Sequence, residues 1–435
     1  MLALSREPLQ WMRALCPVAL VMLGVWLVLL LLASVALSRK IAFPPWHDPH
    51  PGGELTQYWM PLAWSTYTYD PMRSLSLPFE EVAFRNRFGR TLRGWWVPGD
   101  PAAASASDVR VGVVCVHGGG RDRRAFLRQS VLFHRRGWHT LLFDCTNHGT
   151  SDGCKAWPRS RWPGRALTYG TREWADVADA VQFARILLAR IDGGNAAEAD
   201  ATSLNAVSSP TTKVVLMGTS QGAVSCILAA AHERLSTPHV DDRERRPASL
   251  ADAFVAENAF LSPAHLFWHL SGHVAQRIFI GPQRYAAQLG IVRAWMLLTT
   301  ALALFRTGNL GVTVELLLRT HKRLCAFRWL LRRYVPERPG AAQSFSGFAS
   351  AVDAVSHIGC PVLFLHGKRD IIVPYQHSLQ LFQLAKQPRQ LWISESAGHT
   401  LLYHAEPEAF ERRVCGFIEE YVVDRSMSHT VSHPS

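Results

Sequence analysis

The chain has 435 residues, of which 48% are hydrophobic and 18% charged, a composition that excludes a disordered chain and allows a sizeable folded core. Its length suits one large α/β domain with an insertion, or two ordinary domains. The formal net charge of +12 could indicate a nucleic-acid partner. However, the Lys and Arg residues are scattered rather than interleaved with stacking aromatic residues, so we expect no nucleic acid and favour a membrane surface.

The first predicted element is a single transmembrane helix over residues 14–38. This stretch contains no charged residue and is longer than the roughly 20 apolar residues that cross a bilayer. A cleaved signal peptide is the alternative, but its apolar region normally runs only about 7–15 residues. The flanking charges do not decide the orientation, because two arginines precede the span and Arg39 and Lys40 follow it.

Beyond the span, residues 43–53 are rich in Pro and Gly and predict a linker. Residues 79–99 contain two alternating runs around a Gly-containing turn, which predicts an antiparallel hairpin. Six apolar runs then alternate with helix-length segments, as in a parallel sheet that is covered by helices on both faces. These runs are residues 109–116, 139–144, 213–218, 252–257, 361–366 and 390–395.

Two segments interrupt the alternation. Residues 193–212 are small and polar and predict a surface loop, whereas residues 260–345 are helical in character and predict a cap. The expected fold class is therefore α/β, with a mostly parallel sheet, a helical cap insertion and an N-terminal membrane helix. The expected divisions are a tail (1–13), the membrane helix (14–38), a linker (39–78), the first part of the core (79–259), the cap (260–345), the second part of the core (346–424) and a C-terminal tail (425–435).

The eight cysteines are dispersed, without CxxC or metal-type pairing, and no Asn-x-Ser/Thr glycosylation acceptor occurs. These features favour a reducing, cytosol-facing location for the folded domain. Because no metal site or nucleotide-binding loop is present in the sequence pattern, we expect no cofactor.

Ser220 lies where an apolar strand (213–218) passes into an Ala-rich helix (221–233), with Gly218 and Gly222 two positions to either side. A sharp strand–turn–helix reversal strains the serine backbone and crowds the strand against the helix, so only glycine fits at the flanking positions. The turn presents the hydroxyl at the sheet edge, beside a helix N-terminus that favours a developing anion. The pattern predicts a nucleophile elbow; a serine in an ordinary Gly-rich turn is the alternative.

Residues 79–424 resemble the α/β-hydrolase superfamily, in which the triad follows the chain order Ser, acid, His. Asp370 in "PVLFLHGKRDIIVP" and His399 in "LWISESAGHT" match the acid and the base. The segment "VVCVHGGGRD" matches the family's oxyanion loop with His117 and Gly118–Gly120. "FDCTNHGTSDG" (143–153) is similar to another family motif, although Asn147–His148 replaces the commoner Gly–His. "YGTREWADVADAV" (169–181) is similar to membrane-anchored and Bem46-like branches of the family.

The resemblance implies that Ser220 attacks a carbonyl carbon, that His399 accepts the serine proton, and that Asp370 orients the imidazole. The main-chain N–H groups of Gly119 and Gln221 would hold the oxyanion, with His117, Gly118 and Gly120 shaping that loop.

Other residues near these positions could fill the same roles. Asp370 could simply cap a turn, Glu395 precedes His399 on the same strand, and His404 falls in the next helical stretch. His117 and His366 are expected to be structural, and Asp144 and His148 are expected to brace loops beside the site.

Within the predicted cap, residues 315–335 form a basic amphipathic helix. It either packs on the domain or rests on anionic lipid. Residues 294–305 are apolar but too short to cross a bilayer, so they would line an acyl-chain channel or touch the interface.

The sequence therefore predicts a membrane-anchored serine hydrolase of carboxylic esters, with a lipid or other acyl ester, or a thioester, as its substrate. A serine peptidase is the alternative within enzymes, but the predicted cap has few carboxylates to hold a substrate amine. A catalytically silent binding protein is the alternative of another class. The sequence leaves the oligomeric state open.

Overall fold

The computed structural model describes residues 70–103, 109–155, 163–164, 167–191, 212–236, 249–278 and 350–424, together with part of 21–38 and residues 295, 299 and 300. Both predicted tails, the linker 43–53 and the amphipathic segment 315–335 lie outside the described residues. So does the predicted loop 193–212, apart from Thr212, which begins a strand.

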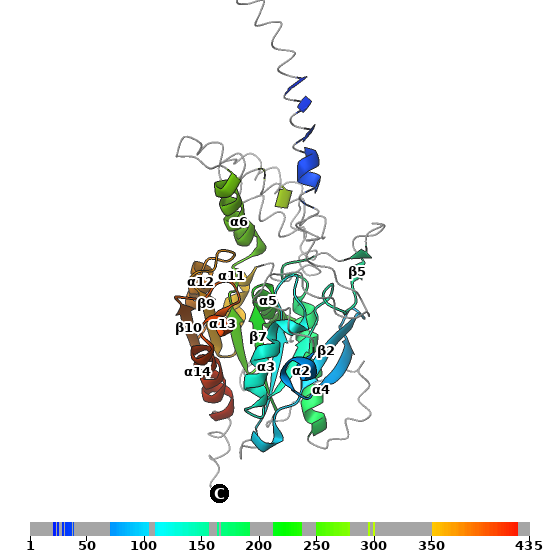
Figure 1. Cartoon of the computed structure of the whole chain (residues 1–435), viewed down its shortest axis with the longest axis vertical. Coiled ribbons are helices and arrows are strands. Elements are labelled where there is room, and N and C mark those ends of the chain that lie inside the picture. The colour runs from blue at the N-terminus through cyan, green and yellow to red at the C-terminus, as the bar shows by residue number, and fades with distance from the viewer. Residues whose placement is uncertain are drawn as a thin grey trace, which may run out of the picture.

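An eight-stranded sheet forms the centre of the molecule (Figure 1), in the order β1-β2-β4-β3-β7-β8-β9-β10. β1 pairs antiparallel with β2, β2 pairs antiparallel with β4, and all the other neighbours are parallel. The predicted hairpin and the mostly parallel sheet are therefore confirmed. The strands are β1 (Glu80–Arg85), β2 (Thr91–Val97), β3 (Arg110–Val116), β4 (His139–Phe143), β7 (Thr212–Thr219), β8 (Ala253–Glu257), β9 (Val362–Gly367) and β10 (Arg389–Ser394); β5 (Cys154–Lys155) and β6 (Pro163–Gly164) form a separate pair.

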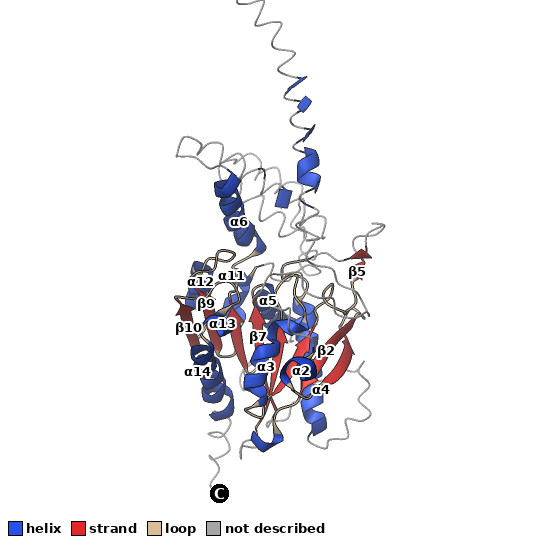
Figure 2. Ribbon diagram, in the orientation of Figure 1, coloured by secondary structure: helices blue, strands red, loops and turns tan. Residues whose placement is uncertain are grey.

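Helices cover both faces of the sheet (Figure 2), as the continuous apolar strands require. Successive residues of β3 point to opposite faces: Val114 and Val116 pack into one core, whereas Val113 and Cys115 pack into the other. The first core includes side chains of α4, α5 and α12, and the second includes side chains of α3 and α14. The helices are α2 (Pro71–Leu75), α3 (Leu127–His134), α4 (Trp174–Ile191), α5 (Gln221–Ser236), α6 (Pro263–Ile278), α11 (Ala351–Ala354), α12 (Gln376–Leu384), α13 (Leu402–Ala405) and α14 (Pro407–Ile418), with short 3₁₀ or π turns η1 (Pro101–Ala103), η2 (Arg123–Phe126), η5 (Val355–His357) and η6 (Glu419–Val423).

The carboxyl ends of the parallel strands meet at one edge of the sheet, and the helix α6 rises from this edge in Figure 1. α6 is the described start of the predicted cap. Most of the remaining cap, including residues 294–305 apart from Trp295, Thr299 and Thr300, lies outside the described residues.

No helix among the described residues is both long enough and apolar enough to cross a membrane. The predicted span over residues 14–38 is described only in part, and its described residues are helical.

Candidate active site

Ser220 occupies the turn between β7 and α5 with a positive φ of 52°, which a residue with a Cβ rarely adopts. Its main-chain N–H donates to the carbonyl of Glu257 at 2.8 Å, which ties the turn to the neighbouring strand β8. A Cβ on Gly222 would lie 2.1 Å from the carbonyl oxygen of Val116, and one on Gly218 would lie 2.6 Å from the Gly222 backbone. Both glycines are therefore required by close backbone contact, as predicted for a nucleophile elbow.

Three side chains that are far apart in the sequence meet at this turn. The Nε2 atom of His399 lies 3.1 Å from the Oγ atom of Ser220, and its Nδ1 atom lies 2.6 Å from Oδ2 of Asp370. An ionised carboxylate only accepts hydrogen bonds, so Nδ1 donates to Asp370 and Nε2 of the neutral imidazole accepts the serine hydroxyl. The His399 side chain is 22% exposed whereas that of Asp370 is fully buried, so the chain of bonds runs from the interior to an accessible serine.

The carboxylate of Asp370 is held from several sides. Its Oδ1 atom accepts the main-chain N–H groups of Ile372 and Val373 at 2.8 and 2.9 Å. Burial alone would raise its pKa, but the charge of His399 and hydrogen bonds from His366 and His399 outweigh burial, so the pKa lies well below its usual range. The acid is therefore ionised at neutral pH, as a partner for an imidazolium must be.

The loop after β3 lies directly against the serine. A Cβ on Gly118 would contact the Cβ of Ser220 at 3.4 Å, and one on Gly119 would lie 2.6 Å from Oε1 of Gln221. Gln221 is the first residue of α5, so its N–H belongs to the helix-end amides that lack an intrahelical acceptor. This arrangement brings Gly119 next to the side chain of Gln221, the residue that follows the nucleophile, and the main-chain N–H groups of Gly119 and Gln221 remain the predicted oxyanion donors.

The histidines of the surrounding loops are buried and accept hydrogen bonds from neighbouring main-chain groups. The Nε2 atom of His117 accepts the main-chain N–H of Cys145 at 3.0 Å, and burial lowers the pKa of His117. The Nε2 atom of His148 accepts the N–H of Gly120 at 3.3 Å, which ties the loop after β4 to the oxyanion loop. Asp144 is fully buried and binds the guanidinium of Arg123 at 2.8 Å, so it braces the same loops.

Neither Glu395 nor His404 is bonded to the triad in place of Asp370 or His399 among the contacts of the described residues. Glu395 pairs with Lys368 at 2.8 Å, and its side chain is 75% exposed. His404 lies in α13, whereas His399 bonds both Ser220 and Asp370. His366 is buried, with its Nδ1 atom 2.7 Å from Ser378 Oγ and its Nε2 atom 2.9 Å from the Val373 carbonyl.

Sequence reasoning missed two polar residues at the end of β8. Glu257 is buried, and burial raises its pKa to about 7 although the Leu402 main chain and the charge of His399 both lower it. Asn258 is fully buried and donates from Nδ2 to Oδ2 of Asp370 at 2.7 Å. The available signal was the polar pair at the end of an apolar strand, at the edge where Ser220 and Asp370 also lie.

Two acidic residues of the segment 169–181, Asp176 and Asp179, bond to neighbouring loops. Asp176 accepts the N–H of Thr146 and the amide of Asn86 at 2.7 and 2.6 Å. Asp179 accepts the side chain and main chain of Arg87 at 2.6–3.3 Å. These carboxylates fasten the β1–β2 turn and the loop after β4 to α4.

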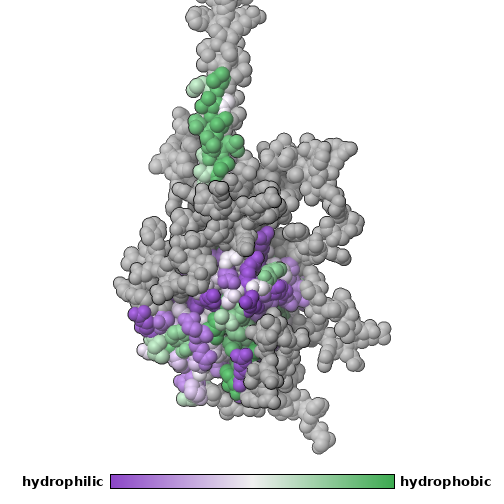
Figure 3. Space-filling model, turned by 90° about the vertical axis from the view of Figure 1, so that its right-hand side faces the viewer, coloured by the Kyte–Doolittle hydropathy of each residue, from purple (hydrophilic) through white to green (hydrophobic). Residues whose placement is uncertain are grey.

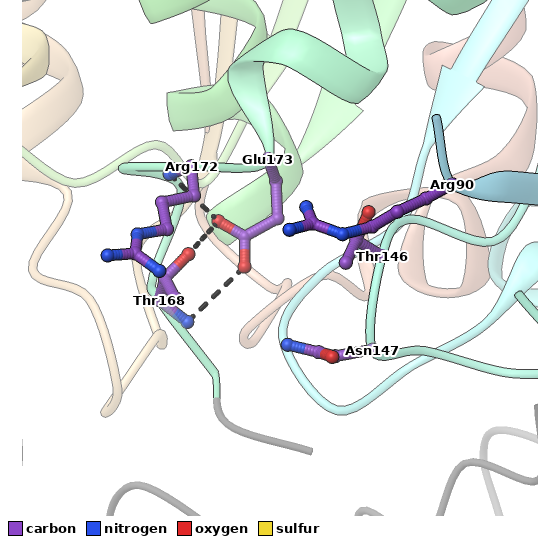
Figure 4. A pocket seen from close by; sticks show the side chains of 6 residues that line it. All are labelled: Arg90, Thr146, Asn147, Thr168, Arg172 and Glu173. Carbon is purple, nitrogen blue, oxygen red and sulfur yellow. Dashed lines mark hydrogen bonds between the residues drawn. The ribbon is translucent and has the colours of Figure 1, made fainter. Parts of the chain in front are cut away.

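Glu173 lines a small, open pocket (Figure 4), and its carboxylate accepts hydrogen bonds from Thr168 and Gly170. Since polar and charged side chains surround this pocket, it does not suit an acyl chain. The lining residues are Arg90, Thr146, Asn147, Thr168, Arg172 and Glu173.

Residues 113–413 match the alpha/beta hydrolase family, and the chain belongs to that family. The uncharacterized protein YfhR of Escherichia coli is 35% identical over 86 residues, which cover 20% of this chain. The chain spans about a quarter (27%) of the length of this curated relative.

Solved structures similar to this chain include an esterase of Pyrococcus furiosus, with 15% identity, a TM-score of 0.46 and coverage of 86% of this chain and 99% of that one. An esterase of Exiguobacterium antarcticum has 12% identity, a TM-score of 0.42 and coverage of 78% and 100%, respectively. An acylaminoacyl peptidase of Pyrococcus horikoshii has 12% identity, a TM-score of 0.41 and coverage of 80% and 42%.

Proposed function

We propose that the protein is a serine hydrolase that cleaves carboxylic esters through an acyl-enzyme. The observation that carries the proposal is the continuous hydrogen-bonded chain from Ser220 through His399 to Asp370, with distances of 3.1 and 2.6 Å. An unreactive serine has no need of a strained turn or of an imidazole whose tautomer is set by a buried carboxylate. The intact chain also argues against a catalytically silent binding protein.

In the proposed mechanism, Ser220 Oγ attacks the ester carbonyl carbon while Nε2 of His399 takes its proton. Asp370 keeps Nδ1 protonated and stabilises the imidazolium. The amides of Gly119 and Gln221 hold the oxyanion, and the imidazolium then gives its proton to the departing alkoxide. Water, deprotonated by His399, attacks the acyl-enzyme, and collapse of the second tetrahedral intermediate releases the acid and returns the proton to Ser220.

The test is labelling with a fluorophosphonate probe and hydrolysis of p-nitrophenyl butyrate by the full chain. Ser220→Ala should abolish labelling and lower kcat by on the order of 10⁴-fold or more. Ser130→Ala is the matched control, because Ser130 is a buried serine of α3 whose hydroxyl donates to the Leu127 carbonyl of the same helix. This variant should keep both the labelling and the esterase activity. Labelling that persists in Ser220→Ala would refute the assignment.

The preference for a lipid or other long acyl ester is supported by apolar side chains beside the triad. Ile371 and Ile372 follow the acid directly and are 57% and 37% exposed, and Trp268 of α6 is 39% exposed. The ring of His269 in α6 lies 3.3 Å from the Ile371 carbonyl, so the helix and the acid loop are in contact. A series of p-nitrophenyl esters should show kcat/KM rising with acyl length; a flat series would rule out the lipid preference.

Membrane attachment through residues 14–38 is part of the same proposal. In the described residues of this segment, Val, Leu and Met side chains are 39–64% exposed, whereas Ser34 and Ser38 are buried; Figure 3 shows the exposed apolar side chains as a green column. Trp295 of the predicted cap donates from Nε1 to Ser34 Oγ at 2.6 Å. An apolar exterior with polar side chains turned to a protein contact is typical of helices in lipid.

We further propose that the catalytic domain faces the cytosol, which is supported by free thiols at Cys115, Cys145, Cys226, Cys360 and Cys415. Full-length protein should stay with membranes after carbonate extraction, whereas a chain lacking residues 1–40 should be released. Protease added to sealed vesicles would show which side carries the domain.

A further inference from the structure

Asn258 connects the acid and the base of the triad. It directly follows β8, is fully buried, and has a positive φ of 51°. Its Nδ2 atom donates to Oδ2 of Asp370 at 2.7 Å, and its Oδ1 atom accepts the main-chain N–H of Thr400, the residue after His399, at 3.3 Å. One side chain thus touches the loops that carry Asp370 and His399.

The bond from Asn258 ends on the oxygen atom that serves the base. Oδ2 of Asp370 also accepts Nδ1 of His399 at 2.6 Å and lies 3.3 Å from Nε2 of His366. The other oxygen is held by two main-chain N–H groups. Asn258 therefore helps to set the plane of the carboxylate, and with it the direction in which Oδ2 faces the imidazole.

An asparagine suits this position for two reasons. It carries both a donor and an acceptor, which an aspartate or a leucine of similar size does not, and it tolerates a positive φ better than most residues with a Cβ. The main-chain N–H of Asn258 donates to the Leu365 carbonyl of β9 at 2.8 Å, so the backbone is anchored to the strand that leads to Asp370.

We propose that Asn258 is a positioning residue that locks the Asp370 carboxylate and the His399 loop into the geometry needed for proton transfer from Ser220. The inference rests on the proposed function, because it needs the triad to be catalytic. In this role Asn258 acts through its bonds to Asp370 and to the loop of the base.

The experiment compares two variants of the full chain with wild type, using p-nitrophenyl butyrate. Asn258→Gly removes the side chain and keeps the positive φ. Because a charge-assisted hydrogen bond is lost, kcat should fall by about ten- to a hundredfold while KM changes by less than about threefold.

Asn258→Asp supplies the more specific readout. A carboxyl at this position can donate to Asp370 only while it is protonated, and two carboxyls at this distance share a proton. The ratio of variant to wild-type kcat should therefore fall as the pH rises from 5 to 8. Among the described residues, the ionisable groups that surround the pair are Glu257, His366, His377 and His399. These residues are the same in both enzymes.

Asn86→Asp is the matched control. Asn86 is a buried asparagine that donates to the buried carboxylate of Asp176 at 2.6 Å, in contact with α4 rather than with the triad. Its kcat ratio to wild type should not change with pH. Circular dichroism at each pH checks that every variant is folded, so that only folded proteins are compared.

Unchanged kcat in Asn258→Gly, or a kcat ratio for Asn258→Asp that does not depend on pH, would overturn the inference. Either result would leave the proposed function intact, provided that Ser220→Ala abolishes labelling. Persistent labelling of Ser220→Ala would instead refute the proposed function itself.

Discussion

The sheet edge that carries Ser220, Asp370 and His399 (the triad edge) and the helix α4 both contain buried, hydrogen-bonded carboxylates. The two regions differ in the groups that these carboxylates face. Asp370 faces His399, an ionisable side chain that is partly exposed and in turn bonds Ser220. Asp179 faces the guanidinium of Arg87, and Asp176 faces the amide of Asn86 and the main chain of Thr146. A buried carboxylate is thus a sign of chemistry only when its partner can exchange a proton with an accessible atom.

The two regions also differ in the charge state that their surroundings favour. The pKa of Asp370 is lowered because His399 and His366 outweigh burial. Burial raises the pKa of Asp176 to about 6, although its hydrogen bonds from Thr146 and Asn86 lower it. The triad carboxylate is stabilised as an anion next to a cation-forming partner, whereas Asp176 is bound by the neutral donors of Thr146 and Asn86.

The largest expected effect is a loss of catalytic activity when the carboxylate of the triad is changed. Asp370→Asn should lower kcat by on the order of 10³–10⁴-fold, because an amide can leave the imidazole in the wrong tautomer. Steady-state hydrolysis of p-nitrophenyl butyrate measures it. A loss of less than tenfold would mean that another group orients His399.

At α4 we expect a loss of stability with little change in catalytic activity. Asp179→Asn removes the charge from a partly buried contact with Arg87 and should destabilise the fold by about 1–3 kcal/mol. Chemical denaturation gives the free energy of unfolding, and kcat per folded molecule should stay within about twofold of wild type. If kcat fell as far as in Asp370→Asn, the distinction between the two regions would be wrong.

The last expected effect depends on pH and concerns Glu257, which lies at the same sheet edge as Ser220 and Asp370 but has a raised pKa. A carboxyl whose folded pKa is about 7, above its ordinary 4.5, contributes stability that is fully present below pH 4.5 and is lost as the pH rises through 7. Glu257→Gln lacks this titration. Its free energy of unfolding relative to wild type should therefore increase by roughly 1–3 kcal/mol between pH 5 and 8.

The matched control for this measurement is Glu395→Gln, because the Glu395 side chain is 75% exposed. Its stability difference from wild type should vary little with pH over the same range. A difference that is equally constant for Glu257→Gln would show that Glu257 ionises normally in the folded protein.

Several features could be predicted from local sequence. The six apolar runs all form strands of the sheet, because continuous apolar residues are required when both faces of a parallel sheet are covered. Gly218 and Gly222 identified the turn at Ser220, since their missing Cβ atoms are required by close backbone contact. The domain divisions, the membrane helix and the catalytic roles remain predictions.

By itself, the sequence determined the strand order along the chain, the elbow at Ser220 and the identity of three side chains, 220, 370 and 399, that could form a triad. Only the tertiary structure decided that Asn258, 112 positions from Asp370, bonds that acid. It also decided that the carboxylates of α4 bond the β1–β2 turn and the loop after β4 rather than the triad. The physical reason is that strand and turn formation depend on neighbouring residues, whereas the partner of a buried polar group depends on which distant backbone segments pack around it.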